Sequence, residues 1–367
     1  MKGNIIVGFW YNTSSSFSEE SCGGQSEGVV LNNIPIEYNV IIVAFMQRID
    51  GSNDSIPDFK PSGYTDSEFR QQVEEIHKQG RKVLIALGGR DAHIVLHRGD
   101  ELSLATRINE LVDKFGFDGL NIALDEDAMV LADNQLVIPA ALRMLKDYYC
   151  AVGRSFIISM TPRFAHLSKK HEFVSYINAL VGYYDFIAPV YYGADDEGLW
   201  VDSVGWVSHR NEVLREDFLY FLTESLLTGT RDFIKIPYDK FILALPINSD
   251  ATKDCMINPQ SVKNALVRLK ASELSIHGLM AWPVSGDADI KSSGEPDYLA
   301  FIQCCGDLIG DSTDTTVVPA TPEWRPGLHY SDTDVVGWNG KEWVCVKSHD
   351  SDIFWTPARS SRLWIPC

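Results

Sequence analysis

Residues 120–125 contain the first candidate for a catalytic side chain, the carboxyl group of Asp125. Apolar residues occupy positions 120, 122 and 124, whereas Asn121, Ala123 and Asp125 take the alternate positions. In a β-strand, side chains two residues apart share a face, so these three should lie together. Only Asp125 among them carries a carboxyl group, which can donate or accept a proton. A strand with one apolar face and one small, polar face suits a barrel with helices outside and the axis inside.

Two aromatic residues stand at the ends of similar apolar runs. Tyr191 follows the run 186–190, and Trp282 ends the run 277–282. Functional side chains of barrels lie at the C-terminal ends of the strands, so we predict that both rings line a ligand site. Packing in the core is the alternative for both.

Strand-like apolar runs recur eight times and give the chain its predicted architecture. They are residues 5–10, 40–45, 83–87, 119–124, 156–160, 186–190, 241–245 and 277–282. The segments between them have the apolar spacing of helices. Alternating strands and helices indicate a parallel sheet, and eight units predict a (β/α)8 TIM barrel over residues 1–306. A doubly wound open sheet is the alternative, but no Gly-rich nucleotide loop follows the first run.

The C-terminal region has a different composition. Residues 307–321 are rich in Asp, Ser, Thr, Val and Pro without a helical or strand period, which predicts a linker. Residues 322–367 are predicted to form a small β-rich domain, because Asn339-Gly340 joins two strand-like runs as a hairpin turn. Five of the nine tryptophans lie there: Trp324, Trp338, Trp343, Trp355 and Trp364. Because the core of so small a domain does not need five tryptophans, we expect some of them to lie on its surface.

Charge and composition narrow the choice of partner. The 367 residues carry a formal net charge of -18 at pH 7, which disfavours nucleic acid and anionic membranes and is compatible with a neutral polysaccharide. No apolar run approaches the roughly 20 residues of a membrane span. No secretory signal precedes the first strand, so the export route stays open. The seven cysteines lack metal-ligand spacing, and we expect neither a metal nor a cofactor.

The fourth run carries the most specific resemblance. Asp118-Gly119-Leu120-Asn121-Ile122-Ala123-Leu124-Asp125 resembles the Asp-Gly-x-Asp-x-Asp-x-Glu signature of glycoside hydrolase family 18, the chitinases and their relatives. Asp118 and Gly119 match. Asn121, Ala123 and Asp125 stand where the family has Asp, Asp and the catalytic Glu.

Three further runs resemble strands of the same family. Residues 82–89 are similar to its Ser-x-Gly-Gly strand, with Ala86 in place of Ser. Tyr191 matches a Tyr that the family follows with Asp or Asn, whereas Tyr192 follows it here. Trp282 matches the Trp that floors the central sugar subsite. The resemblance covers roughly residues 3–306 and implies a family 18 barrel.

The resemblance also implies a mechanism, which this chain retains only in part. In family 18, the Glu protonates the glycosidic oxygen while the N-acetyl carbonyl of the substrate attacks the anomeric carbon. The preceding Asp orients the acetamide, and the Tyr hydroxyl binds its carbonyl. Ala123 lacks the orienting carboxylate, and Asp125 is shorter than Glu by roughly 1.5 Å. Because a misplacement of about 1 Å can cost about a hundredfold in rate, and a lost general acid about 10² to 10⁴, we predict a degenerate active site.

The other acidic residues leave alternatives open. Asp125 is either a degenerate acid or a solvated carboxylate at the end of a strand. Glu126 is a poor substitute, because its strand parity turns it away from Asp125. Asp127 has the right parity, but we expect it in the following loop.

The tail resembles the carbohydrate-binding modules of families 5 and 12 nearly end to end. The resemblance includes Trp338-Asn339-Gly340-Lys341 and Trp355-Thr356-Pro357. Such modules bind crystalline chitin or cellulose by stacking exposed aromatic rings on sugar rings. The resemblance implies that Trp355 is the exposed ring and that Trp324 and Trp364 belong to the core.

The function that fits these features is a chitinase-like lectin with a chitin-binding module. It would bind chitin, chitooligosaccharides or other N-acetylglucosamine-containing glycans without cleaving them, outside the cell. Its sugar contacts would be Trp282, Tyr191 and Trp355, together with Trp338 and Trp343, which fit either a surface or the core. A weakly active or altered-specificity chitinase that uses Asp125 as its acid is the first alternative. The second is a scaffold subunit of a secreted assembly.

Overall fold

The computed structural model describes residues 4–12, 30–49, 55–89, 92–192, 197–246, 259–282, 284, 324, 327–338, 341–351, 356–360 and 362–366. The chain divides into two compact units, Met1–Gly310 and Asp311–Cys367. The predicted linker, 307–321, lies outside the described residues.

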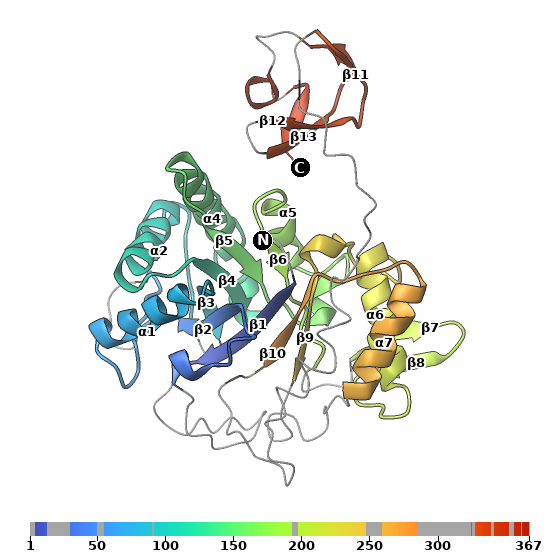
Figure 1. Ribbon diagram of the computed structural model, residues 1–367, viewed down its shortest axis with the longest axis horizontal. Helices are drawn as coiled ribbons and strands as arrows, with labels where there is room; N and C mark the ends of the chain where they lie inside the picture. Colours follow the sequence, from blue (N-terminus) through green and yellow to red (C-terminus); the bar gives the residue numbers. More distant parts are fainter. Residues whose placement is uncertain are drawn as a thin grey trace. The chain divides into compact units, whose positions relative to one another are not determined.

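Eight parallel strands build the first unit (Figure 1). They are β1 (Ile5–Tyr11), β2 (Val40–Met46), β3 (Lys82–Gly89), β4 (Gly119–Leu124), β5 (Ile157–Met160), β6 (Phe186–Ile187), β9 (Ile242–Pro246) and β10 (Gly278–Trp282). Their order in the sheet is β6-β5-β4-β3-β2-β1-β10-β9. Parallel bridges from Ile187 to Phe241 and from Val190 to Ala244 join the two outer segments and close the sheet on itself. All eight predicted runs are strands of this sheet, and the TIM barrel is confirmed.

Helices connect the strands and surround the barrel (Figure 1). They are α1 (Asp66–Lys78), α2 (Glu101–Phe115), α3 (Glu126–Val130), α4 (Asn134–Ala151), α5 (Val174–Ala179), α6 (Arg215–Thr228) and α7 (Pro259–Ala271), with 3-10 turns at Leu31–Asn33, Phe164–Leu167 and Tyr238–Lys240. In α2, Leu104, Ile108, Leu111 and Phe115 are buried at helical spacing. This is the apolar stripe that the sequence predicts, and it packs against the sheet. A short hairpin, β7 (Gly198–Val201) and β8 (Gly205–Ser208), precedes α6.

Side chains along each barrel strand alternate between two apolar layers. On β2, Ile41 and Val43 belong to the outer layer, which the strands share with the helices. Val40, Ile42 and Ala44 belong to the inner layer, which fills the barrel itself. The barrel is therefore a packed core with a functional surface only at its ends.

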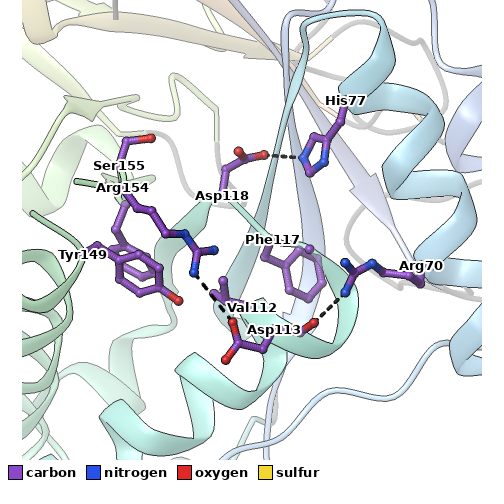
Figure 2. Close-up of a pocket in the computed structure, with 11 residues that line it drawn as sticks. Arg70, His77, Val112, Asp113, Phe117, Asp118, Tyr149, Arg154 and Ser155 are labelled. Atoms are coloured by element: carbon purple, nitrogen blue, oxygen red, sulfur yellow. Dashed lines mark hydrogen bonds and ion pairs between the residues drawn. The ribbon is translucent and has the colours of Figure 1, made fainter. Parts of the chain in front are cut away.

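Asp118 anchors the N-terminal end of β4 (Figure 2). Its carboxylate accepts hydrogen bonds from His77 Nε2 at 2.8 Å, Lys82 Nζ at 2.8 Å and the backbone N–H of Val83 at 2.9 Å. Burial by itself would raise the pKa of Asp118, but these hydrogen bonds hold it below its ordinary value. The carboxylate therefore ties the start of β4 to β3 and α1.

Gly119, the next residue, allows β4 to approach β5. A Cβ at this position would lie 2.0 Å from the carbonyl oxygen of Ile157, so any side chain would force the two strands apart. An open cavity of about 480 Å³ lies beside this end of β4, with Tyr149 and Arg154 among its lining residues (Figure 2). In such barrels the N-terminal ends of the strands serve stability, whereas the opposite ends carry function.

The second unit is a small antiparallel β structure. Its strands are β11 (His329–Tyr330), β12 (Val335–Trp338), β13 (Lys341–Cys345), β14 (His349–Asp350) and β15 (Trp364–Pro366), with a 3-10 turn at Pro357–Arg359. Strands β12, β13 and β15 form one sheet, and β11 pairs with β14. Trp338 pairs with Lys341 across the predicted hairpin, whose turn residues Asn339-Gly340 lie outside the described residues.

The tryptophans of this unit occupy different environments. Trp324 and Trp364 are buried in its core, as predicted. Trp338 and Trp343 are half-buried and pack against that core, so each keeps part of its ring exposed. Trp355 lies outside the described residues.

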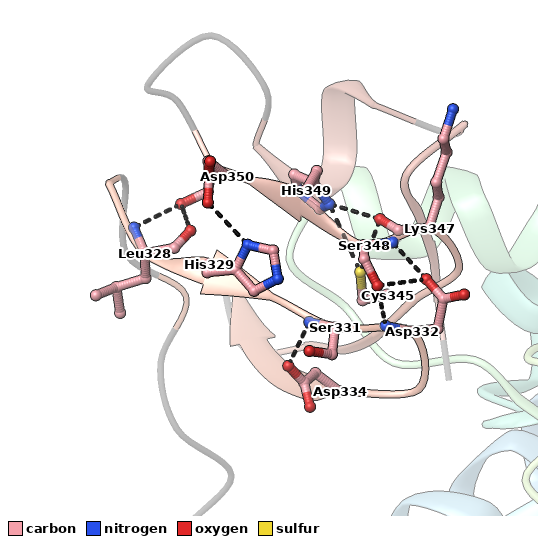
Figure 3. Close-up of polar contacts among 11 residues, drawn as sticks. Leu328, His329, Ser331, Asp332, Asp334, Cys345, Lys347, Ser348, His349 and Asp350 are labelled. Atoms are coloured by element: carbon pink, nitrogen blue, oxygen red, sulfur yellow. Dashed lines mark hydrogen bonds and ion pairs between the residues drawn. The ribbon is translucent and has the colours of Figure 1, made fainter.

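Polar side chains hold the ends of the short strands in this unit (Figure 3). His329 Nδ1 on β11 lies 2.8 Å from Asp350 Oδ1 on β14. Asp332 accepts hydrogen bonds from the backbone N–H and the hydroxyl of Ser348. With so small an apolar core, these local contacts contribute to the order of the unit.

Candidate functional site

Five aromatic rings gather at the C-terminal end of the barrel, and we call them the mouth cluster: Phe9, Tyr11, Phe45, Tyr192 and Trp282. Trp282, the last residue of β10, lies against Phe9 with ring centroids 4.0 Å apart and planes inclined by 35°. Tyr11 and the same indole meet edge to face at 5.4 Å. Phe9 is fully buried, whereas Trp282 and Tyr11 are half-buried. The cluster is a packed aromatic floor with part of its surface open, which suits the apolar face of a flat ligand.

Tyr191 faces away from the mouth cluster, contrary to our prediction. It is fully buried in the outer layer, where its hydroxyl lies 2.9 Å from Thr223 Oγ1 on α6 and its ring packs against Phe218. Tyr192 belongs to the inner layer instead, and its ring centroid lies 6.3 Å from that of Trp282. Tyr191 therefore does not belong to the mouth cluster, contrary to its predicted site role, and its neighbour Tyr192 does.

Asn121 and Ala123 lie on the inner side of β4, as the alternation predicts. Asn121 is fully buried: its Oδ1 accepts a hydrogen bond from Ser159 Oγ at 2.8 Å, and its Nδ2 donates one to Thr161 Oγ1 at 2.9 Å. An amide can both accept and donate, whereas a carboxylate at this position could only accept. Ala123 packs against the inner layer and contributes only a methyl group.

Two glycines at the end of β3 bring this strand close to the mouth. Gly88 and Gly89 have φ values of 134° and 94°, which side chains rarely adopt. A Cβ on Gly88 would lie 2.1 Å from the carbonyl oxygen of Ala123, and one on Gly89 would lie 2.7 Å from the ring of Phe45. Ala86, two residues earlier, is buried in the inner layer. The glycines therefore serve the close approach of backbone and aromatic ring.

Asp125 begins helix α3. Strand β4 ends at Leu124, and Asp125 is the N-cap residue, with its Oδ1 accepting a hydrogen bond from the backbone N–H of Ala128 at 2.8 Å. This contact satisfies one of the free N–H groups that every helix start presents. Asp127, which we expected in a loop, is instead exposed in the first turn of this helix. The carboxylate of Asp125 thus has a structural partner at the position where a catalytic acid was predicted.

Glu126 takes part in a charged cluster beside the mouth. Its Oε1 lies 3.0 Å from Arg163 Nη1 and 3.3 Å from His166 Nε2, and Arg163 Nη2 also reaches Glu197 Oε1 at 2.8 Å. The hydrogen bond from His166, helped by the charge of Arg163, lowers the pKa of Glu126. Burial lowers the pKa of His166 to about 4, against the effect of Glu126. At neutral pH, Glu126 is therefore an ionised carboxylate and a poor proton donor.

A cavity of about 360 Å³ lies at this end of β4 and β5. It is lined by Leu124, Asp125, Glu126, Asp127, Thr161, Arg163 and His166. No group of three or more His, Cys, Asp or Glu in the described parts of the chain is arranged to hold a metal ion. In those same parts, no helix is long and apolar enough to cross a membrane.

Comparisons with known proteins agree with this architecture. Residues 323–365 match the family model described as carbohydrate-binding module family 5/12. A chitinase of Enterococcus faecalis is 41% identical over 293 residues, which span 79% of this chain and 84% of the relative. A family GH18 chitinase from Chromobacterium violaceum has the same fold, with a TM-score of 0.63, 19% identity and 83% of both chains covered. The chain belongs to glycoside hydrolase family 18.

The family 18 fold alone does not decide the activity. A xylanase and alpha-amylase inhibitor protein from Scadoxus multiflorus shares it too, with a TM-score of 0.53 and 17% identity over 77% of this chain and 94% of that one. The residues at the mouth must therefore carry the functional argument. In this family 18 barrel, they offer aromatic surface, and the two acids that follow β4 directly, Asp125 and Glu126, are held by Ala128 and by Arg163 with His166.

Proposed function

We propose that this protein is a chitinase-like lectin, which binds N-acetylglucosamine oligosaccharides at the barrel mouth and leaves them intact. The observation that carries the proposal is the contrast between Trp282 and Asp125. Trp282 keeps a packed, half-open ring where a sugar can stack. Asp125 caps α3 through Ala128, so the residue in place of the catalytic acid has a structural function.

The replaced positions support the absence of hydrolysis. Substrate-assisted cleavage needs an acid of the right length and a carboxylate that orients the acetamide. Ala123 cannot orient the acetamide, and Asp125 is shorter than Glu by roughly 1.5 Å. Glu126 is ion-paired to Arg163 and hydrogen-bonded to His166, and therefore does not replace the missing acid.

The C-terminal module extends the proposal to insoluble chitin. Its match to carbohydrate-binding module family 5/12 covers residues 323–365 of the unit Asp311–Cys367. We assign Trp355 as its exposed stacking ring, with Trp338 and Trp343 contributing the exposed parts of their rings. An insoluble polysaccharide ligand implies that the protein acts outside the cell.

A weakly active chitinase is the alternative, and one observation favours it. The relative that is 41% identical to this chain carries the name chitinase. In this alternative, Asp125 leaves its capping contact when substrate binds and protonates the glycosidic oxygen.

Calorimetry with chitohexaose, paired with a cleavage assay, tests the proposal. We expect heat of binding and no products from the unmodified protein. Trp282→Ala should weaken binding by about tenfold to a hundredfold, because burying an aromatic side chain contributes about 1.5–3 kcal/mol. Tyr238→Ala is the matched control, because this exposed tyrosine lies just before β9 at the opposite end of the barrel.

The outcomes separate the three functions. Cleavage at about 1 per second or faster, abolished by Asp125→Asn, would establish the chitinase instead. If millimolar chitohexaose gives no heat of binding, the barrel is not a lectin for this sugar, and the scaffold function is favoured.

A further inference from the structure

The hairpin β7–β8 exposes two tryptophans side by side. Trp200 on β7 is directly opposite Trp206 on β8 in the antiparallel register. Their side chains are 62% and 48% exposed, although Trp is a residue that proteins usually cover. Neither ring takes part in the mouth cluster or in the packing of the outer layer.

The rest of the hairpin fixes the two rings in place. Leu199, Val201 and Val207 alternate with the tryptophans and are buried in the outer layer. Gly198 lies beneath Trp206, since a Cβ there would come within 3.0 Å of the indole. The exposed rings therefore rest on a rigid support, which reduces the entropy lost when a ligand binds them.

Both the chain and an ion pair connect the hairpin to the C-terminal end of the barrel. It lies in the connection that follows β6, and these connections form the functional end of such a barrel. Glu197, immediately before β7, is ion-paired with Arg163, which also contacts Glu126 just after β4. The chain from Tyr192 to Gly198 can span at most about 20 Å. The base of the hairpin thus belongs to the same end of the barrel as the proposed sugar site.

Area and charge favour a flat, uncharged ligand. Two tryptophans at these exposures offer roughly 200–300 Å² of apolar surface. A stable protein interface buries about 800 Å² on each partner, so this patch alone is too small for a second protein chain. Residues 197–208 contain Glu197 and Asp202 and no Lys or Arg, which disfavours nucleic acid and anionic lipid.

From these features, we infer that Trp200 and Trp206 form a second sugar-stacking platform, which holds a neighbouring stretch of an insoluble N-acetylglucosamine polymer. The inference rests on the proposed function for the identity of the sugar. Together with the C-terminal module, the platform would give the protein two attachment points on one polymer surface. Two-point attachment raises retention well above that of either point alone.

The test is partition of the full chain onto chitin beads. We expect Trp200→Ala/Trp206→Ala to lower the partition coefficient by about tenfold or more, both with the module intact and with Trp355→Ala. Trp200→Tyr/Trp206→Tyr should keep most of the binding, because an aromatic face remains. Tyr238→Ala should leave it unchanged. Thermal unfolding of each variant checks that the hairpin is still folded.

Two results would overturn the platform. One is an unchanged partition coefficient of the double alanine variant in both backgrounds. The other is light scattering that shows a dimer of the unmodified protein and a monomer of the variant, since a second copy would then cover the rings. Chitohexaose binding at Trp282 should not change in the double variant. Bead binding that depends on the platform, without any heat from chitohexaose, would support the platform while rejecting the mouth site.

Discussion

The two ends of strand β4 differ in how far they match the family 18 signature. At the N-terminal end, Asp118 and Gly119 match it, and both serve the construction of the barrel. At the C-terminal end, Asn121, Ala123 and Asp125 all depart from it. The residues that build this part of the barrel are thus separate from those at the catalytic positions of the signature. One strand can keep the first set while residues of the second set differ from the signature, and the fold is retained.

The contacts at the two ends differ in strength as well as in purpose. Asp118 is largely buried and accepts three hydrogen bonds, two of them from His77 and Lys82. Asp125 is half-buried and accepts a hydrogen bond from the backbone N–H of Ala128. A change at the first position should therefore affect stability much more than one at the second.

Asp118→Ala should give the largest effect. It leaves the imidazole of His77, the ammonium of Lys82 and a backbone N–H without their acceptor, and hydrogen bonds that involve a charged group contribute about 1.5–3 kcal/mol. Urea unfolding at neutral pH measures the change. Asp113→Ala is the control, because this carboxylate is 60% exposed and lies 3.9 Å from Arg154, so its loss should cost about 1 kcal/mol or less. Equal losses from both variants would contradict the structural role of Asp118.

The pH dependence of stability should distinguish the two ends further. Because burial lowers the pKa of His166 to about 4, the folded protein resists a proton that the unfolded chain accepts near pH 6.5. The contribution of His166 to the free energy of unfolding is therefore fully present above pH 6.5, and it falls as the pH drops toward 4. Asp118, whose pKa is lowered, contributes to the free energy of unfolding in a more acidic range. Its contribution is fully present above the ordinary pKa of Asp and is lost as the pH falls below that value.

His166→Asn tests this assignment. Relative to the variant, the unmodified protein should lose about 2 kcal/mol of unfolding free energy between pH 6.5 and pH 5. Urea unfolding at the two pH values measures the difference, and a titration of His166 by NMR should give the low pKa directly. Parallel pH profiles for the two proteins would show that His166 is not the residue responsible.

The sequence predicted the barrel well because each of its strands overlaps one of the eight apolar runs. It misplaced Tyr191, although the same period contained the answer. Phe186, Ala188 and Val190 all lie in the inner layer, and continuing their alternation leads to Tyr192. The prediction followed the motif, in which a Tyr precedes Asp or Asn, instead of the alternation.

Other parts of the site could not be predicted from local patterns. Glu126, Arg163 and Glu197 come from three separate connections, and only the closed sheet brings them together. The strands that carry Trp200 and Trp206 are four residues long and lie outside the eight apolar runs, in the connection between two of them. The capping role of Asp125 had a visible signal, because an Asp before a helical segment is a typical N-cap residue.

Asp125 gives the smallest expected effect and the clearest separation of its two possible roles. Asp125→Ala removes the cap of α3 and should cost about 1 kcal/mol, whereas Asp125→Asn should cost little, because Asn caps helices as well as Asp does. If Asp125 is only a cap, both variants should bind chitohexaose as the unmodified protein does, measured by calorimetry. Their cleavage activity should also equal that of the unmodified protein. If it is a working acid, Asn must abolish cleavage while leaving stability unchanged, since an amide can cap the helix but cannot donate the proton. Stability and cleavage measured on the same pair of variants therefore assign the residue to one role or the other.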